Sequence, residues 1–204
     1  TDATFQKLCE WEQRYPESIM VVHCEKNGKQ GAARNIGIEY ASAEYLAYAD
    51  IDDVMDPYMY EKLLTAAKQQ ECDLVVCRSK KVNPHNLLNQ DSKRTKENDW
   101  IIEIDNAEKR LGFIQMDLNI AVWNKLYRRS MISENQVYFP EGLIYEDLFF
   151  TTLVQHYADK VYILEEELYH HLIWEESTTG DLKNWKKKLD WLSVEELKII
   201  ELRK

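Results

Sequence analysis

The chain has 204 residues, of which 45% are hydrophobic and 11% aromatic, and this is enough to bury one sizeable core, so we expect one domain. Its formal charge of -10 at pH 7 excludes a general nucleic-acid binder, because phosphate backbones are held by a surplus of Lys and Arg. No apolar run reaches eighteen residues and no signal peptide is recognisable, so the sequence predicts neither a membrane span nor export. The four cysteines lack CxxC spacing, which indicates a reducing, cytoplasmic compartment.

Helix-like and strand-like patterns alternate along the first part of the chain. Apolar side chains recur at helical spacing over 3–15, and this run stops before Pro16. The β-branched run SIMVVHC (18–24) that follows is typical of a buried strand. The same alternation continues with a helix over 31–43, a strand over 44–49, a helix over 56–70 and a strand over 72–79.

The remainder of the chain is less regular. The polar segment 80–98 predicts an exposed loop or a short hairpin, whose role the sequence leaves open. Further elements are expected as a helix over 106–116, a helix that opens at Glu146 and Asp147, a strand over 160–166 and a helix from 182 onward. The alternation predicts an α/β fold in which helices flank a largely parallel sheet.

The last helix is amphipathic. We expect it to form a C-terminal segment, 180–204, after one domain over 1–179. One of its stripes carries Trp185, Leu189, Leu192, Glu196 and Ile199, with Lys183, Lys186, Lys187 and Lys188 beside it. We expect this stripe to dock on the domain, and peripheral contact with a membrane surface is the alternative.

A cluster of carboxylates follows the strand predicted at 44–49. In the stretch EYLAYADIDDVMDPY these are Asp50, Asp52, Asp53 and Asp56. Left unpaired, their like charges would repel one another and cost stability, so a cation is expected among them, and carboxylate oxygens suit Mn²⁺ or Mg²⁺. An EF-hand is excluded, because Met55 stands where that loop needs glycine. We expect Asp50 and Asp52 to be the metal ligands and Asp56 to cap the next helix; solvated turn residues are the alternative for the first two.

A second candidate site lies in NGKQGAARNIG (27–37). Gly28 and Gly31 permit tight turns, and the N–H groups of the helix that begins here favour negative charge. Arg34 adds a planar fork suited to a phosphate or a base edge. An ordinary ion pair between Arg34 and a surface acid is the alternative.

Four motifs in the same order resemble those of family 2 glycosyltransferases. The string NGKQGAARNIGIEYASAEYLAYADIDD resembles the middle of that family's nucleotide-binding half, and the opening TD resembles the tail of its Asp-Gly-Ser-Thr-Asp motif. AVWNKLYRRSMI (121–132) resembles its Trp-x-Lys-Leu-Tyr-Arg segment, and FPEGLIYEDLFF (139–150) its Glu-Asp-x-x-Phe segment. The resemblance covers nearly the whole chain to about residue 179. Lys29, where many members have glycine, and YHHLIW (169–174), where Tyr-Tyr-Arg is usual, are departures.

This resemblance implies a GT-A-type, Rossmann-like fold and an inverting transfer of a hexosyl or N-acetylhexosaminyl group. The donor would be a nucleotide-diphosphate sugar, a UDP-sugar in particular, and the acceptor a hydroxyl of a glycan or a lipid-linked molecule. The implied donor contacts are Gly31, Arg34, Asn35 and Asp50; the implied metal ligands are Asp52 and Asp50; the implied general base is Asp147; the implied acceptor contacts are Trp123, Lys125 and Glu146.

Several alternatives stay open. Glu146 and Asp147 could be ordinary helix-start acids, and the helix dipole there would lower the pKa of Asp147 and weaken it as a base. Trp123 could be a core residue, and His170 and His171, which point to opposite faces of a strand, are expected to be packed or exposed strand residues unless one completes a metal site.

A sugar nucleotidyltransferase and a non-catalytic carbohydrate-binding relative are the other function classes. The first two strands of the family, with the Asp that holds the nucleotide base, have no counterpart here, so we expect the sequence to be part of a longer protein. A cytoplasmic place at the inner face of the cell membrane is expected, and the oligomeric state is left open.

Overall fold

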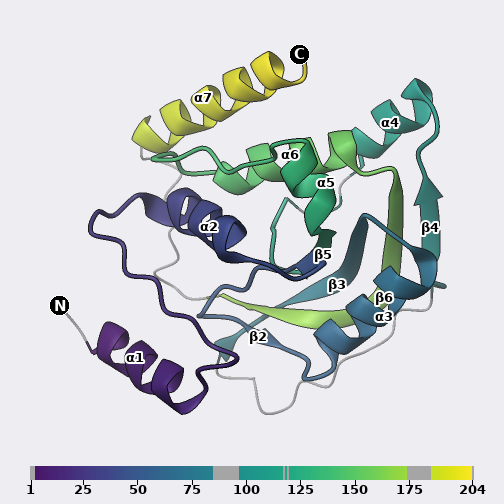
Figure 1. Cartoon of the computed structure of the whole chain (residues 1–204). Coiled ribbons are helices and arrows are strands. Elements are labelled where there is room, and N and C mark those ends of the chain that lie inside the picture. The colour runs from purple at the N-terminus through teal and green to yellow at the C-terminus, as the bar shows by residue number, and fades with distance from the viewer. Residues whose placement is uncertain (1–2, 85–96, 117, 119, 174–184, 204) are drawn as a thin grey trace.

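The computed structural model describes residues 3–84, 97–116, 118, 120–173 and 185–203. A six-stranded mixed sheet lies at its centre, with helices on both faces (Figure 1). The strands are β1 (Tyr45–Leu46), β2 (Val54–Met55), β3 (Leu74–Val82), β4 (Trp100–Glu103), β5 (Lys125–Arg128) and β6 (Lys160–Leu172). Their order is β1-β5-β3-β6-β2, and β4 also pairs with β6.

The prediction of a largely parallel sheet is wrong. Only β3 and β6 pair in parallel, and the four other pairings are antiparallel. Of the four strands predicted from apolar runs, three are present as β1, β3 and β6, and these share one direction. β5 lies between β1 and β3 and runs against both, and β3 and β6 pair in parallel. The short strands β2, β4 and β5, which lack such runs, reverse direction and make the sheet mixed.

Helices cover the two faces of the sheet unequally. They are α1 (Thr4–Arg14), α2 (Lys29–Tyr40), α3 (Met59–Gln70), α4 (Ala107–Ile114), α5 (Arg129–Glu134), α6 (Glu146–Tyr157) and α7 (Trp185–Glu201). On one face α3 packs against alternate residues of β3 such as Val75 and Cys77. The other face, with Leu74 and Val76, forms the larger core with side chains of α4, α5, α6 and α7. Alternate burial of this kind follows from the two-residue period of a strand.

The strand predicted at 18–24 is absent. The structure gives these residues no strand hydrogen bonding, and Met20 and Val22 are exposed. A β-branched run forms a strand only where a neighbouring strand pairs with it, and within the described residues none lies beside this one. Cys24 is therefore exposed, whereas Cys77 is buried in β3.

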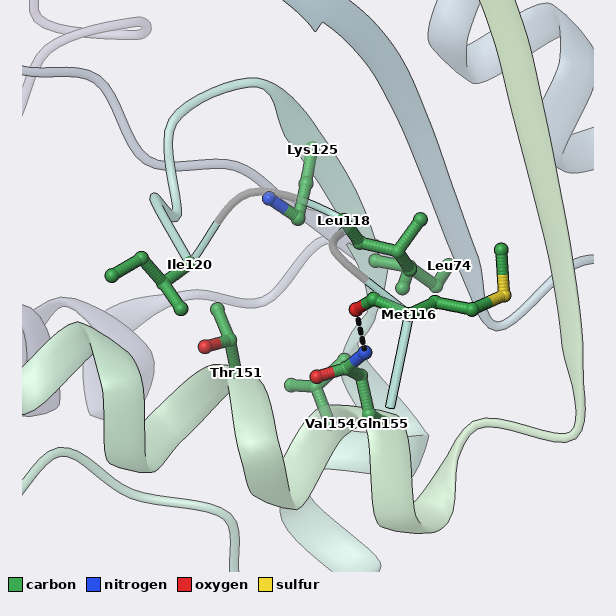
Figure 2. A pocket seen from close by; sticks show the side chains of 8 residues that line it. All are labelled: Leu74, Met116, Leu118, Ile120, Lys125, Thr151, Val154 and Gln155. Atoms are coloured by element: carbon green, nitrogen blue, oxygen red, sulfur yellow. Dashed lines mark hydrogen bonds between the residues drawn. The ribbon is translucent and has the colours of Figure 1, made fainter. Parts of the chain in front are cut away.

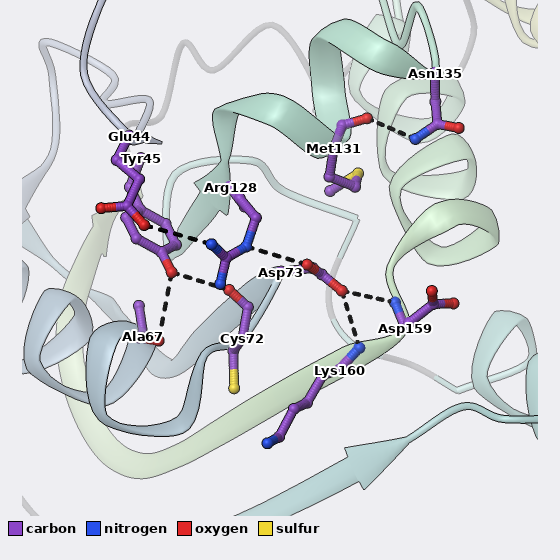
Figure 3. Close-up of polar contacts among 10 residues, drawn as sticks. All are labelled: Glu44, Tyr45, Ala67, Cys72, Asp73, Arg128, Met131, Asn135, Asp159 and Lys160. Atoms are coloured by element: carbon purple, nitrogen blue, oxygen red, sulfur yellow. Dashed lines mark hydrogen bonds and ion pairs between the residues drawn. The ribbon is translucent and has the colours of Figure 1, made fainter.

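Polar contacts fasten the ends of three strands together (Figure 3). The Asp73 carboxylate, directly before β3, accepts hydrogen bonds from Arg128 Nε at 3.2 Å, from Asp159 N at 3.0 Å and from Lys160 N at 3.1 Å. Arg128 also pairs with Glu44 beside β1. One carboxylate thus sets the relative positions of β3, β5 and β6.

The C-terminal helix α7 packs on α6 with the face opposite to the one predicted. Val194 is fully buried in the larger core, whereas Trp185, Leu192 and Ile199 of the predicted docking stripe are each more than half exposed. The predicted boundary at 179/180 lies outside the described residues, as does Lys183. Within the described part of the chain, every helix falls short of the length or the apolar character that a membrane span requires.

Candidate active site

The start of α2 fits closely against the segment that precedes α6. A Cβ atom placed on Gly31 would lie 2.6 Å from the carbonyl oxygen of Pro140 and 3.5 Å from Cβ of Glu146. Real Cβ atoms do not approach backbone oxygen at the shorter of these distances, so glycine is required at position 31. This contact brings the 27–37 motif and the 139–150 motif, more than a hundred residues apart in sequence, to one place.

Arg34 links three of the predicted site segments. Its guanidinium donates to Glu146 Oε1 at 2.7 Å and to Asp50 Oδ1 at 3.1 Å, and it lies over the Phe139 ring at 5.4 Å from the centroid. The Arg34 and Glu146 side chains are only 13% and 8% exposed. Arg34 therefore pairs with the buried Glu146 and the partly buried Asp50 of the site, and the alternative of a pair with a surface acid alone is wrong.

Asn35 is committed to the backbone at Phe139. Its Nδ2 donates to Phe139 O at 2.9 Å, and its Oδ1 accepts from Phe139 N at 2.8 Å. This pair of bonds fixes the entry of the 139–146 segment, so in the structure Asn35 positions the site; its predicted contact with a nucleotide stays a prediction.

The four carboxylates after β1 divide into different roles. Asp53 fastens the turn to β6, because it accepts from the Tyr169 hydroxyl at 2.7 Å and from Leu172 N at 2.9 Å. Asp56 accepts from Tyr58 N at 2.8 Å, which closes the turn before α3, while the cap position of α3 is Tyr58. The prediction that Asp56 itself caps the helix is therefore wrong by two residues.

Asp50 and Asp52 are the carboxylates left for a ligand. Asp50 gives one oxygen to Arg34, and Asp52 is exposed and makes no hydrogen bond or ion pair with any described residue. Across the described ranges, no three His, Cys, Asp or Glu side chains converge to hold a metal ion. A protein usually supplies one or two carboxylates to a Mg²⁺ ion, and substrate phosphates and water supply the other ligands. The exposed carboxylate of Asp52 therefore fits a divalent cation whose coordination the substrate completes.

Asp147 lies in the first turn of α6, beside Glu146. Burial raises the pKa of Asp147 above its usual value, against the opposing effects of a hydrogen bond from Leu148 N and of the Arg34 charge. The expected lowering of this pKa by the helix dipole is therefore wrong, because desolvation outweighs it. Burial also raises the pKa of Glu146, although Arg34 bonds it directly. Arg34, Asp50, Glu146 and Asp147 thus form one charged cluster.

The predicted acceptor residues Trp123 and Lys125 are buried. The Trp123 ring stacks on Tyr169 at 4.1 Å between centroids and leans on His171, so one indole face is already covered. Lys125 Nζ donates to Ala121 O and to Asn124 Oδ1, and burial lowers the pKa of Lys125 to about 7. Their contact with an acceptor stays a prediction.

A small cavity of about 40 Å³, with apolar and polar side chains in its lining, lies beside Lys125 (Figure 2). Thr151, Val154 and Gln155 of α6 line one side of it, and Leu118 and Ile120 face them. Such a volume has room for a few water molecules and no sugar.

His170 and His171 take different environments, as their strand positions predict. His170 is buried with its Nε2 unpaired among the described residues, and His171 leans on Trp123. Neither joins a group of ligands within the described residues.

Two site residues escaped the sequence reasoning. The Tyr169 hydroxyl accepts from Asp50 N at 3.4 Å and donates to Asp53, so it holds both ends of the acidic turn. Asp190 of α7 accepts from Ile144 N, in the loop before α6. Tyr169 stood in the motif YHHLIW, whereas no local signal marks Asp190.

Comparison with known proteins agrees with these motifs. The model of the family described as Glycosyl transferase family 2 matches residues 1–135. The chain is 27% identical over 201 residues to the uncharacterized glycosyltransferase YibD of Escherichia coli K12, an overlap of 94% of this chain and 55% of that protein. It is 34% identical over 160 residues to the putative glycosyltransferase EpsH of Bacillus subtilis 168, an overlap of 75% and 44%.

Among solved structures, residues 1–349 of Staphylococcus aureus TarS in complex with UDP-GlcNAc superpose with a TM-score of 0.70 at 21% identity, covering 98% of this chain and 54% of that one. This likeness confirms the predicted GT-A-type fold, with the sheet mixed. The chain spans about half the length of the curated relatives it matches.

Proposed function

Because the chain belongs to glycosyl transferase family 2, we propose that the protein is a metal-dependent, inverting glycosyltransferase that moves a sugar from a nucleotide-diphosphate sugar to an acceptor hydroxyl. The observation that carries this proposal is the convergence of Arg34, Asp50, Glu146 and Asp147 from three separated motifs. A purely structural domain has no need of three acids around one buried arginine.

Asp147 is the proposed general base. Its carboxylate takes the proton of the acceptor hydroxyl while that oxygen bonds to the anomeric carbon, and the bond from that carbon to the diphosphate breaks with its electron pair on the diphosphate. A single displacement of this kind inverts the anomeric configuration. The raised pKa of Asp147 supports the role, because a base works best when its pKa approaches the working pH.

Asp52 and Asp50 are the proposed holders of Mn²⁺ or Mg²⁺. The bound cation would stabilise the negative charge of the leaving diphosphate. Asp52 offers an exposed carboxylate, and Asp50 is oriented by Arg34 and by the Tyr169 hydroxyl. Because residue 31 is glycine, the start of α2 packs closely against Pro140 and Glu146. The free backbone N–H groups at this helix start favour a phosphate.

The proposed donor is a UDP-sugar with a hexosyl or N-acetylhexosaminyl group, because the structurally similar TarS is described with UDP-GlcNAc. The proposed acceptor is a glycan or a lipid-linked molecule, and the proposed place of the reaction is the cytoplasmic face of the cell membrane, where a lipid-linked acceptor would lie. TarS itself is described as a poly(ribitol-phosphate) beta-N-acetylglucosaminyltransferase, and that name supports a polymer with free hydroxyl groups as the acceptor class.

The test is turnover of UDP-sugars by the full-length protein, with Mn²⁺ and with EDTA, followed by UDP release and by the anomeric configuration of the product. Release of UDP that needs the cation and disappears in Asp147→Asn supports the proposal. Formation of pyrophosphate from UTP and a sugar phosphate would instead indicate a sugar nucleotidyltransferase. Binding of a glycan without UDP release would indicate the non-catalytic relative.

A further inference from the structure

The C-terminal helix reaches two loops of the candidate active site through one side chain. In Figure 1, α7 lies above α6, and its first turn is on the side of α2. Asp190 Oδ2 accepts a hydrogen bond from Ile144 N at 3.1 Å and lies 3.4 Å from Lys29 Nζ. Ile144 belongs to the loop that leads into α6, and Lys29 begins α2.

One of these contacts is made by a residue with left-handed backbone and the other by the residue directly before one. Lys29 has φ of 62°, and Tyr145, directly after Ile144, has φ of 71°. A side chain with a Cβ rarely adopts this conformation, which persists only where the surrounding structure holds it, and such residues gather at functional sites. Tyr145 is also the residue directly before Glu146 and Asp147, so its conformation sets the direction in which α6 starts.

We propose that Asp190 is a positioning residue, whose carboxylate holds the loop before α6 and so fixes Asp147 relative to the donor side of the site. This inference rests on the proposed function. The bond to the Ile144 amide carries most of the effect, because a carboxylate strengthens a hydrogen bond and this amide lies next to the strained residue. The Lys29 contact contributes less, because the lysine side chain is 44% exposed and such pairs are weak.

The other half of the loop is held independently. Asn35 bonds both backbone groups of Phe139, and Arg34 bonds Glu146. Between Phe139 and Glu146, Asp190 is the residue of α7 that bonds the backbone of the loop. Its loss should loosen the approach to Asp147 while leaving the donor contacts of Arg34 and Asp50 in place.

The test compares Asp190→Ala with Asp190→Asn in the full-length protein. Asparagine keeps an oxygen that accepts from Ile144 N and loses only the charge, whereas alanine loses both contacts. In Asp190→Ala we expect the Ile144 amide to exchange with deuterium about 10-fold faster, as expected for a lost charged hydrogen bond. We expect kcat to fall about 10- to 100-fold, since a small misplacement of a reacting group has effects of this size, with UDP affinity unchanged. Asp190→Asn should keep both the exchange rate of the Ile144 amide and kcat close to the wild-type values.

Two further variants separate the causes. Lys29→Ala removes only the ion pair and should leave Ile144 exchange unchanged. Glu196→Ala, on the exposed face of the same helix, controls for any change to α7. Unchanged exchange and kcat in Asp190→Ala would overturn the proposal, and so would a lower melting temperature with kcat intact, which is the pattern of a merely structural contact. If the wild type releases no UDP from any UDP-sugar, the proposed function fails, while the Ile144 exchange still decides whether Asp190 holds the loop.

Discussion

Replacing Arg34 by methionine should destabilise the protein strongly, because Arg34 neutralises a buried acid. Methionine keeps the length of the side chain and removes the charge and both hydrogen bonds. Glu146, with its side chain 8% exposed, would then be a buried carboxylate without its partner. Removing one partner of a buried pair costs about 3–5 kcal/mol. The Asp50 contact adds little, because that carboxylate is 30% exposed and water screens it.

This cost should depend on pH in a defined direction. Burial already raises the pKa of Glu146 above 4.5, so the folded protein binds this proton more tightly than the unfolded chain does. Loss of Arg34 raises that pKa further. The stability deficit of Arg34→Met relative to the wild type is therefore fully present above the raised pKa, and it shrinks as the pH falls and Glu146 becomes neutral. We expect the largest deficit at about pH 8 and a much smaller one at about pH 5.

The assay is denaturant unfolding at both pH values, with thermal unfolding as a second measure. A loss of about 3 kcal/mol corresponds to a melting temperature lower by roughly 6–12 °C in a domain of this size. Arg34→Met combined with Glu146→Gln should recover about half of the loss or more, because the unpaired charge is gone. A deficit below about 1 kcal/mol at pH 8, or one that is equal at both pH values, would refute the claim that Arg34 neutralises Glu146.

Three further outcomes are expected. Asp52→Asn should weaken UDP binding in Mn²⁺ by about 10-fold or more in a calorimetric titration, because it removes an unpaired carboxylate from the cation site; equal wild-type affinity in Mn²⁺ and EDTA would contradict this. Asp147→Asn should lower transfer by roughly 10²- to 10⁴-fold with UDP affinity nearly unchanged, and Glu146→Gln should lower it less; near-normal transfer by Asp147→Asn would place the base elsewhere. We expect these 204 residues to self-associate through the exposed apolar face of α7 as their concentration rises, and Leu192→Lys, on that face, should reduce this association in sedimentation experiments. The equally exposed Leu111 gives the matched control, and an equal effect of Leu111→Lys would show that the α7 face is not the one that associates.

The elements with strong periodicity could be predicted from the sequence, and the pairing of strands could not. The helix α2, the helix α6 and the strand β3 lie close to where apolar spacing and turn residues placed them. β5 lies inside AVWNKLYRRSMI, where a resemblance marked the residues but no apolar run marked a strand, and its insertion between β1 and β3 makes the sheet mixed. A strand of four residues is specified by its neighbours more than by its own sequence.

The candidate site divides in the same way. Motif positions identified Arg34, Asp50, Glu146 and Asp147, and the structure brings these four together. The sequence could not show that Arg34 would bind acids from two motifs, because residues 34 and 146 are brought together by long-range contacts such as that of Gly31 with the backbone at 140.

Asp147 shows why local reasoning about a charge can fail. Its place in the first turn of α6 is visible in the sequence, and the dipole of a helix favours the charged carboxylate there. That effect amounts to about 0.3–1 kcal/mol at an exposed terminus. Desolvation acts in the other direction and can be larger, but it depends on the segments that cover the helix start, which come from α2 and from the turn after β1. The same first-turn position therefore gives an ordinary surface acid in an exposed helix and a candidate base in this one, and the packing of Gly31 and Arg34 against α6 decides between them.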